Sequence, residues 1–285
     1  MGLVERVKEF VDGAVGKAGE LVRKARETDR QGYLATKKEE VSFHEAEKGK
    51  AGWLSPAYSK SRTIRLDPRV LADNRCVAAL PNAKETESYK VLRTQVLQRM
   101  KDKGGNTLMI TSATPGEGKT LTAINLACTM AKDFEQTVLL VDCDLRKQDI
   151  HGILGIESEK GLIDYLFDCC PISDLIMWPG IEKLTVISGG RIIKDSAELL
   201  GSPKMKDLVT DMKNRYPDRY VFFDVPPILA AADALAFMPM VDHVLLVVRA
   251  GITPLNDVKR ALELIPAEKV LGLVLNRDRR PVKVY

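Results

Sequence analysis

The stretch "TLMITSATPGEGKTLTAINLACTMAK", residues 107–132, decides the fold, because it joins a strand pattern, a glycine-rich loop and a helix pattern in immediate succession. "TLMITS" is short and apolar with β-branched residues, as buried strands are. The loop ends in "GEGKT", which matches the end of the phosphate-loop motif G-x-x-x-x-G-K-[ST]. Ala113 stands where that motif has its first glycine, and it is tolerated if its backbone angles are ordinary.

The loop carries the chemistry that a phosphate group needs. Backbone N–H groups after Gly116 converge on the N-terminus of a helix, where anions bind. Lys119 can bridge the β- and γ-phosphates, and the Thr120 hydroxyl can ligate Mg²⁺. The alternative, a chance glycine-rich turn, is disfavoured by the strand and helix on either side. We predict that nucleotide binds here through Thr114, Pro115, Gly116, Glu117, Gly118, Lys119, Thr120 and Leu121.

A second motif, "VLLVDCDLRK" at residues 138–147, ends a buried strand in two acids. Asp142 and Asp144 are two residues apart, so in an extended chain both point to the same side. The carboxyl end of a strand is where α/β sheets bind ligands. One carboxylate could hold Mg²⁺ while the other accepts a proton, or the pair could be a helix N-cap beside an exposed acid. The neighbouring phosphate loop favours the functional interpretation.

A third motif, "RYVFFDVPP" at residues 219–227, places Asp224 at the end of another apolar strand. Such a carboxylate orients Mg²⁺ and its waters in phosphate-loop proteins. Two further strand ends are candidates for contact with a base. Asn276 could read an adenine edge or only make a turn, and Arg249 could lie against the base or be exposed.

The runs "TLMITS", "TVLLVDC", "LTVISG", "YVFFD", "HVLLVVR" and "VLGLVLN" are all suited to strands buried on both faces. Helical patterns lie at residues 85–100, 121–132, 197–214 and 254–264. Alternating strands and helices predict an α/β fold, a doubly wound and mostly parallel sheet flanked by helices, of the phosphate-loop NTPase type.

Composition narrows the class of protein. The chain has 285 residues with a net charge of +4, which is too mild to indicate nucleic acid as a partner. No apolar run reaches the roughly 18 residues that span a bilayer. The first ten residues, "MGLVERVKEF", contain no apolar signal segment, so we expect a cytoplasmic location.

The chain divides into three parts by pattern. Residues 1–60 contain an amphipathic helical stripe over 3–24 and then a polar linker. That helix could lie on a membrane as a peripheral contact, pack on a partner or cover the core. Residues 61–276 form the phosphate-loop domain, and residues 277–285 form a basic tail that carries Tyr285.

The three motifs, in this order, resemble the bacterial tyrosine kinases, phosphate-loop proteins related to the Min- and Par-type ATPases. "LLVDCDLR" is similar to the family's D-x-D-x-R segment, and "SATPGEGKT" to its form of the loop. "GLIDYL", "SAELLGSPKM" and "TIRLDPRVLADNR" are similar to segments of the autokinases of exopolysaccharide loci, especially the exosortase-associated branch. The resemblance covers about residues 60–276.

This resemblance implies an ATP- and Mg²⁺-dependent protein-tyrosine autokinase that regulates exopolysaccharide chain length. It implies Lys119 and Asp142 as catalytic residues, with Asp142 as the base for the acceptor hydroxyl. Thr120, Asp144 and Asp224 would hold the metal. A separate membrane protein, the chain-length determinant or polysaccharide co-polymerase, would bring the kinase to the inner face of the cell membrane.

Two departures from the family pattern concern assembly and the acceptor. The family's E-x-x-R-x-x-R helix, which assembles homo-oligomeric rings, appears here as Glu87, Lys90 and Arg93. Lysine keeps the charge but lacks the planar, bidentate guanidinium. The family's cluster of C-terminal tyrosines is reduced to Tyr285, which becomes the candidate phospho-acceptor.

Two other functions remain open. A Min- or Par-type ATPase switch usually carries lysine at the second loop position, where this chain has Thr114. A nucleotide-gated, non-catalytic regulator of polysaccharide export would fit the sparse tail. The retained Lys119, Asp142, Asp144 and Asp224 favour the kinase.

Overall fold

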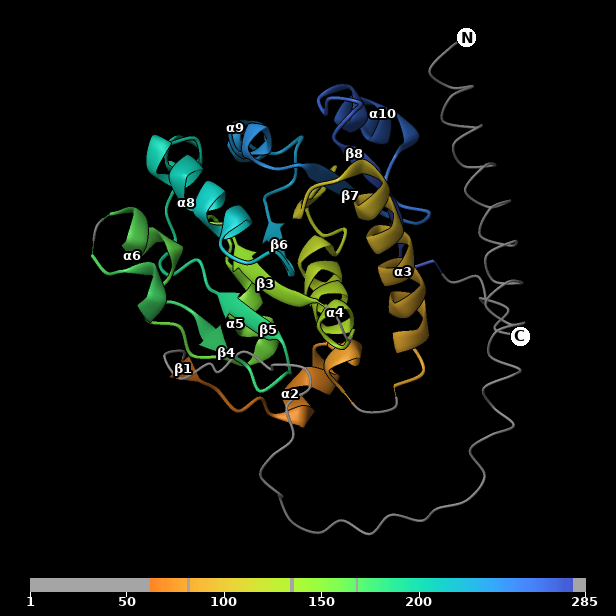
Figure 1. Cartoon of the computed structure of the whole chain (residues 1–285). Helices are drawn as coiled ribbons and strands as arrows, with labels where there is room; N and C mark the ends of the chain where they lie inside the picture. The colour runs from red at the N-terminus through yellow and green to blue at the C-terminus, as the bar shows by residue number, and fades with distance from the viewer. Residues whose placement is uncertain (1–61, 81–82, 134–135, 168, 279–285) are drawn as a thin grey trace, which may run out of the picture. The chain divides into compact units, whose positions relative to one another are not determined.

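The computed structural model describes residues 62–80, 83–133, 136–167 and 169–278 (Figure 1). The helix predicted over 3–24, the linker and Tyr285 lie outside these residues.

An eight-stranded sheet forms the centre of the domain, in the order β1-β4-β5-β3-β6-β2-β7-β8. β4 pairs with β5 in antiparallel fashion and β1 pairs with β4 in parallel, so these two strands run against the other six. The mostly parallel sheet is therefore confirmed. The strands are β1 (Arg62–Thr63), β2 (Thr107–Ser112), β3 (Thr137–Asp142), β4 (Met177–Trp178), β5 (Leu184–Ile187), β6 (Arg219–Asp224), β7 (His243–Arg249) and β8 (Val270–Asn276).

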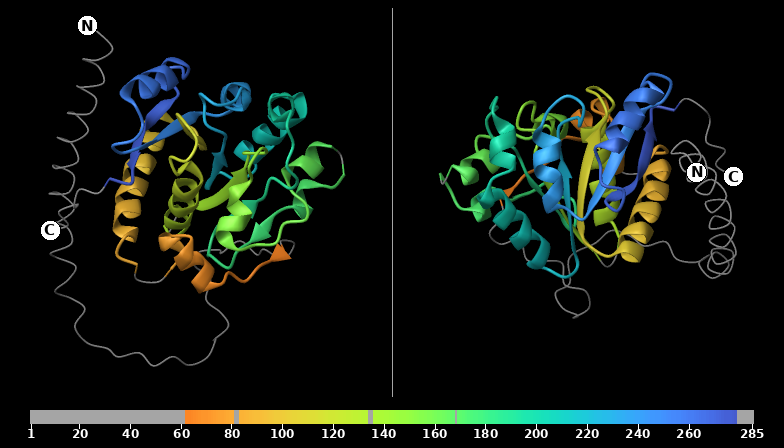
Figure 2. Two further views of the ribbon diagram at one scale, coloured as in Figure 1. Left: turned by 180° about the vertical axis from the view of Figure 1, so that it is seen from behind. Right: turned by 90° about the horizontal axis from the view of Figure 1, so that it is seen from above.

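Helices cover both faces of the sheet (Figures 1 and 2), as a doubly wound fold requires. The α-helices are α2 (Pro68–Asp73), α3 (Thr86–Lys103), α4 (Lys119–Ala131), α5 (Asp149–Leu154), α6 (Leu162–Leu166), α7 (Ser196–Leu200), α8 (Pro203–Asn214), α9 (Asp233–Phe237) and α10 (Leu255–Glu263). Short 3₁₀ turns are η1 (Val77–Ala79), η2 (Ile172–Asp174) and η3 (Met238–Met240).

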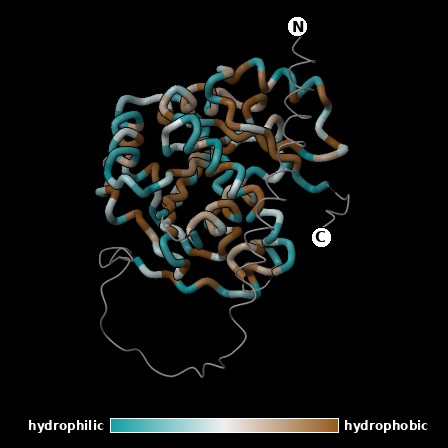
Figure 3. The backbone as a smooth tube through the Cα atoms, turned by 45° about the vertical axis from the view of Figure 1, so that its right-hand side comes forward, coloured by the Kyte–Doolittle hydropathy of each residue, from teal (hydrophilic) through white to brown (hydrophobic). Residues whose placement is uncertain are grey.

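Each buried strand contributes side chains to two hydrophobic cores, one on each face. On β6, Phe222 belongs to the core beneath α3 and α4, whereas Phe223 belongs to the core beneath α8 and α9. Phe223 packs edge-on against Phe237 of α9, with 4.9 Å between ring centroids. Figure 3 shows hydrophobic stretches in the interior and hydrophilic ones at the surface. A fully buried aromatic side chain stabilises the fold by about 2–3 kcal/mol, so both layers are held firmly to the sheet.

The single helix predicted over 197–214 is wrong, because the structure has two helices there. α7 ends at Leu200, and Ser202 then caps α8 by accepting a hydrogen bond at its Oγ from the Met205 backbone N–H (3.2 Å). Pro203 takes the first position of α8, where its missing N–H costs nothing. A serine cap followed by proline starts a new helix rather than continuing the old one.

The edge of the sheet at β8 is covered by side chains from α3. Arg99 donates a hydrogen bond from Nη1 to the Leu271 carbonyl (2.9 Å), and Lys103 donates to the carbonyls of Glu268 and Val270. A Cβ on Gly272 would lie 2.5 Å from Arg99 Nη1, so the glycine makes room for this contact. Helix side chains that occupy the carbonyls of an edge strand leave fewer of its groups open to pairing with another chain.

Candidate active site

The candidate site lies where β3, β6 and β2 end side by side. The three strands are neighbours in the sheet, so the loops that follow them meet at one edge. Backbone hydrogen bonds join these loops: Cys143 N–H to the Asp224 carbonyl (2.8 Å), and Ile228 N–H to the Ser112 carbonyl (2.9 Å). The phosphate loop and both acidic motifs therefore lie together at one edge of the sheet and are joined by hydrogen bonds.

The loop between β2 and α4 has the backbone shape of a phosphate cradle. Gly116 and Gly118 have φ values of 82° and 92°, in the region that favours glycine. A Cβ on Gly116 would meet nothing within 4 Å, so the space above it is open. Ala113 is buried and its φ is not positive, so its ordinary backbone does not need the missing glycine.

Lys119, the first residue of α4, links the phosphate loop to two acids. Its Nζ lies 2.7 Å from Asp144 Oδ2 and 3.3 Å from Asp224 Oδ1, and it donates to Thr120 Oγ1 at 3.1 Å. The residue is only 8% exposed. Burial acts to lower the pKa of Lys119, but the carboxylates of Asp224 and Asp144 outweigh it and raise the pKa above its ordinary value. The ammonium therefore stays charged at neutral pH.

Asp224 ends β6 with no exposed surface. Burial raises its pKa from 3.8 to about 6, although Lys119 acts to lower it. The lysine thus opposes the effect of burial, and with a pKa of about 6 most of the carboxylate is ionised at neutral pH.

Asp142, the residue paired with Asp224 across β3 and β6, is also fully buried. Its Oδ1 accepts from the Asp144 N–H (3.1 Å) and its Oδ2 from the Ile150 N–H (3.2 Å). Burial and the nearby Asp224 raise the pKa of Asp142 well above its ordinary value. A raised pKa makes this carboxyl group a stronger proton acceptor than an ordinary aspartate, and its hydrogen bonds also shape the loop after β3.

The donor atoms around Lys119 suit a hard cation. Mg²⁺ in nucleotide sites is usually held by one or two carboxylates together with phosphate oxygens and water. The Thr120 hydroxyl, Asp144 and Asp224 supply oxygen atoms of this kind at the base of the cradle. Among the residues that the structure describes, no three His, Cys, Asp or Glu side chains form a metal-binding cluster by themselves.

The two candidate base contacts lie next to each other at the ends of β7 and β8, where Arg249 and Asn276 are register partners. Asn276 donates from Nδ2 to the Glu117 carbonyl (2.8 Å) and accepts at Oδ1 from the Arg277 N–H (2.8 Å). Both ends of its amide are therefore engaged within the protein. Adenine contact by Asn276 and Arg249 stays a prediction.

Comparison with known proteins gives the family. A family model described as "AAA domain" matches residues 105–269, more than half of the chain. The tyrosine-protein kinase YwqD of Bacillus subtilis is 34% identical over 222 residues, which are 77% of this chain and 90% of YwqD. This chain belongs to the bacterial tyrosine kinase family.

Solved structures agree with this family. The kinase domain of the Escherichia coli tyrosine kinase ETK superposes with a TM-score of 0.65 and 29% identity, over 79% of this chain and 92% of that domain. The full-length kinase etk is 31% identical, but the match spans only 27% of its length. MinD of Pyrococcus horikoshii, solved with Mg-ADP, has a TM-score of 0.51 and 25% identity over 62% of this chain and 72% of that one. The predicted family and its fold are confirmed.

The assembly residues predicted for this family member lie on α3. Glu87 and Lys90 are exposed and pair with each other (2.5 Å). Arg93 is turned inward instead, and donates from Nη1 to the Thr129 carbonyl at the end of α4 (3.2 Å). Arg93 thus joins two helices of one chain, and the role of all three residues in assembly stays a prediction.

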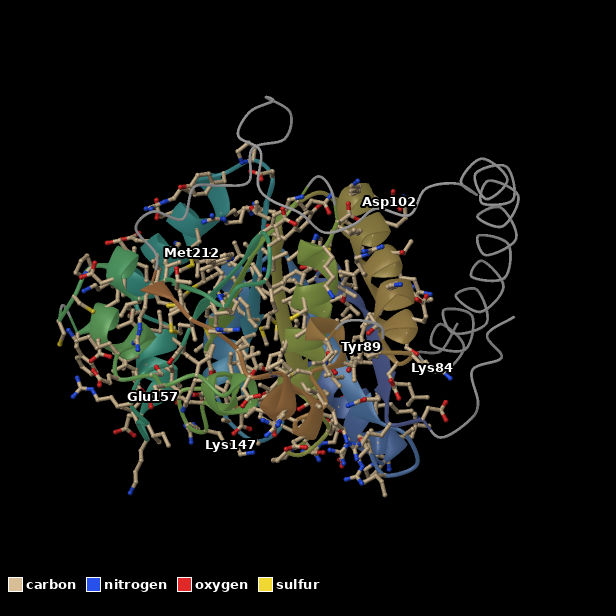
Figure 4. All side chains as sticks on the ribbon, turned by 90° about the horizontal axis from the view of Figure 1, so that it is seen from below. Lys84, Tyr89, Asp102, Lys147, Glu157 and Met212 are labelled. Atoms are coloured by element: carbon tan, nitrogen blue, oxygen red, sulfur yellow. The ribbon has the colours of Figure 1, made fainter. Side chains whose placement is uncertain are left out.

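Sequence reasoning missed one ion pair in this kinase family member, between a half-exposed arginine and a fully buried carboxylate. Arg146 of the D-x-D-x-R segment reaches Asp233 of α9, with Nη2 3.1 Å from Oδ2. The Ser196 hydroxyl of α7 donates to the same carboxylate, and both Asp233 and Ser196 are fully buried. Lys147, the next residue, points outward instead and pairs with Asp149 (2.8 Å; Figure 4). Arg146 belongs to the recognised motif, but nothing in the sequence indicates that its partner is Asp233, which lies 87 positions away.

Proposed function

We propose that this chain is an ATP-dependent protein-tyrosine autokinase with Mg²⁺-assisted phosphoryl transfer. The observation that carries this proposal is the position of Lys119 Nζ, between Asp144 and Asp224 at the head of an open phosphate cradle. The tyrosine-protein kinases among its relatives supply the reaction class. Mg-ADP in the related MinD supports nucleotide as the ligand.

In this proposal each residue of the site has a distinct role. Backbone N–H groups of the cradle and Lys119 bind the phosphates. Thr120, Asp144 and Asp224 hold Mg²⁺, which when bound neutralises charge on the phosphoryl group. Lys119 moves from the two carboxylates to the phosphates as nucleotide binds.

Asp142 would act as the general base for the acceptor hydroxyl. Its raised pKa makes it a stronger proton acceptor than an ordinary aspartate. Its two backbone hydrogen bonds hold the carboxyl group in one orientation, so the base is positioned before the acceptor arrives.

The wider role is exopolysaccharide chain-length control with a membrane chain-length determinant as partner. The sequence segments shared with exopolysaccharide autokinases support it. The match covers 90% of YwqD, so a tyrosine kinase of about this length has a known counterpart. Within the part of the chain that the structure describes, no helix is long and apolar enough to cross a membrane.

The test is phosphorylation of the purified full chain with labelled ATP and Mg²⁺, followed by phosphoamino-acid analysis. We expect phosphotyrosine in the wild type, and none in Lys119→Met or Asp142→Asn. Lys160→Met, which alters an exposed lysine away from the loop, is the matched control. Tyr285→Phe tests the acceptor, and label that persists in it assigns another tyrosine.

Two outcomes would overturn the proposal. Nucleotide binding without phosphotyrosine, both with and without the membrane partner, would support a non-catalytic regulator. Steady ATP hydrolysis without phosphotyrosine would support a Min- or Par-type switch.

A further inference from the structure

Glu117 is a buried carboxylate inside the phosphate loop, and it is only 2% exposed. A negative charge beside a polyphosphate repels it, so this side chain is not placed there to attract the ligand. Its Oε2 accepts a hydrogen bond from the Thr114 backbone N–H (2.8 Å), which closes the loop upon itself. The other carboxylate oxygen, Oε1, accepts from the Thr253 hydroxyl.

Thr253 connects this carboxylate to the end of β7. The Thr253 hydroxyl accepts from the Arg249 backbone N–H (2.9 Å), so its own proton is free for Glu117. The direction of both hydrogen bonds is therefore fixed, and a carboxylate is the acceptor that completes them. Valine, which matches threonine in shape, would remove both.

Asn276 connects the same loop to the end of β8. Its Nδ2 donates to the Glu117 carbonyl, and a Cβ on Gly118 would lie only 2.2 Å from this nitrogen. Because Oδ1 accepts from the Arg277 N–H, the orientation of the amide is defined by its partners. The phosphate loop is thus held from two neighbouring strands.

We propose that Glu117 is a positioning residue that, through Thr253 and Asn276, holds the phosphate loop in its nucleotide-binding shape. The inference rests on the proposed nucleotide binding and deepens it. Nucleotide affinity then depends on the loop after β7 and on the end of β8, neither of which has the phosphate-loop motif. Glu117 acts through the backbone that it orders, and not by touching the phosphates.

The first experiment compares Thr253→Val with Thr253→Ser in the full chain, with Mg-ADP as the probe in calorimetric titrations. Because Thr253→Val leaves a buried carboxylate oxygen without its donor, we expect about 10-fold weaker binding in this variant. We expect Thr253→Ser to bind within about twofold of the wild type, because it keeps the hydroxyl. Thr210→Val, an exposed threonine on α8, is the matched control.

The second experiment separates positioning from general damage. In kinase assays we expect Thr253→Val to raise KM for ATP about as much as it weakens binding, with kcat within about twofold. In a double-mutant cycle with Glu117→Gln, the combined loss of affinity should be well below the product of the single losses.

Specific results would overturn the inference: wild-type affinity in Thr253→Val, a loss in Thr253→Ser as large as in Thr253→Val, or independent effects in the double-mutant cycle. A wild-type chain that binds Mg-ADP but forms no phosphotyrosine overturns the kinase proposal alone. The affinity comparison then still decides the role of Glu117.

Discussion

Asp224 makes the stability of the ligand-free chain depend on pH. Its pKa in the folded state, about 6, lies above the ordinary 3.8, so between these values the folded state binds more protons than the unfolded state. We therefore expect the free energy of unfolding to fall as pH rises from about 4 to 6, by on the order of 3 kcal/mol from this group. Urea titrations across this range measure it.

The matched variant for this pH dependence is Asp224→Asn, which removes the titrating group. Its slope of stability against pH should be shallower than that of the wild type. Asp142, whose pKa is also raised, keeps part of the slope in this variant. An unchanged slope in Asp224→Asn would contradict the assignment.

Gly118 and Gly116 have similar φ values but different surroundings, so they test the close approach of Asn276. Alanine in this region of φ costs about 1–2 kcal/mol at either position. Gly118→Ala should lose considerably more nucleotide affinity and stability than Gly116→Ala, because its Cβ would also collide with Asn276. Asn276→Ala should recover part of the loss in Gly118→Ala, and equal effects of the two glycine variants would refute this.

Single side chains show how far the sequence predicts the site. Lys119, Asp144 and Asp224 each lie in a recognisable motif, Lys119 at the start of the helix after the phosphate loop and the two acids at or just after strand ends, and the structure brings them together. The side-chain partners of Glu117 could not be predicted, since Thr253 is 136 positions away and belongs to no motif. Contacts between distant loops depend on the finished fold.

The short connection between α7 and α8 depends on one serine cap. Ser202→Ala removes the acceptor of the Met205 N–H and should lower the free energy of unfolding by about 1 kcal/mol. Ser173→Ala, which removes an exposed hydroxyl that donates to the exposed Asp174, serves as the control. Equal stability of the two variants in urea would show that Pro203 alone separates the helices.

The Arg146–Asp233 pair joins the loop after β3 to α9, with α7 attached through Ser196. Arg146→Met leaves a fully buried carboxylate without its cation, but the arginine itself is half exposed, so we expect a loss of about 1–2 kcal/mol in unfolding free energy. Arg215→Met breaks an exposed pair with Asp211 on one helix and should cost under about 0.5 kcal/mol. Similar losses in both variants would contradict the importance of burial.

Elements were predictable from the sequence where they are long and strongly patterned. All six predicted strands are present, because strands buried on both faces are continuous apolar runs. β1 and β4 were missed, since two residues carry no periodicity. The short helices α2, α5, α6 and α9 were missed for the same reason, and tertiary packing stabilises them more than local preference does.

Ligand binding should stabilise the domain as a whole, because the loops that form the site come from the three central strands. At about 100 times its Kd, a ligand adds about 2.7 kcal/mol of stability, which corresponds to a rise of about 5–10 °C in Tm. We expect Mg-ADP to produce this rise in thermal unfolding, and EDTA to reduce it. A Lys119→Met chain that shows the full rise would contradict the phosphate contact of that lysine.

β1 and β8 are the two outer strands of the eight-stranded sheet, so the first and last described strands lie at opposite edges. Seven strand spacings separate them, roughly 34 Å at about 4.8 Å each. Domains often bring their ends together, which is why many tolerate circular permutation with a short linker. A circular permutant of residues 62–278 would instead need about ten extended residues to span the sheet, so the natural order of its elements is hard to rearrange.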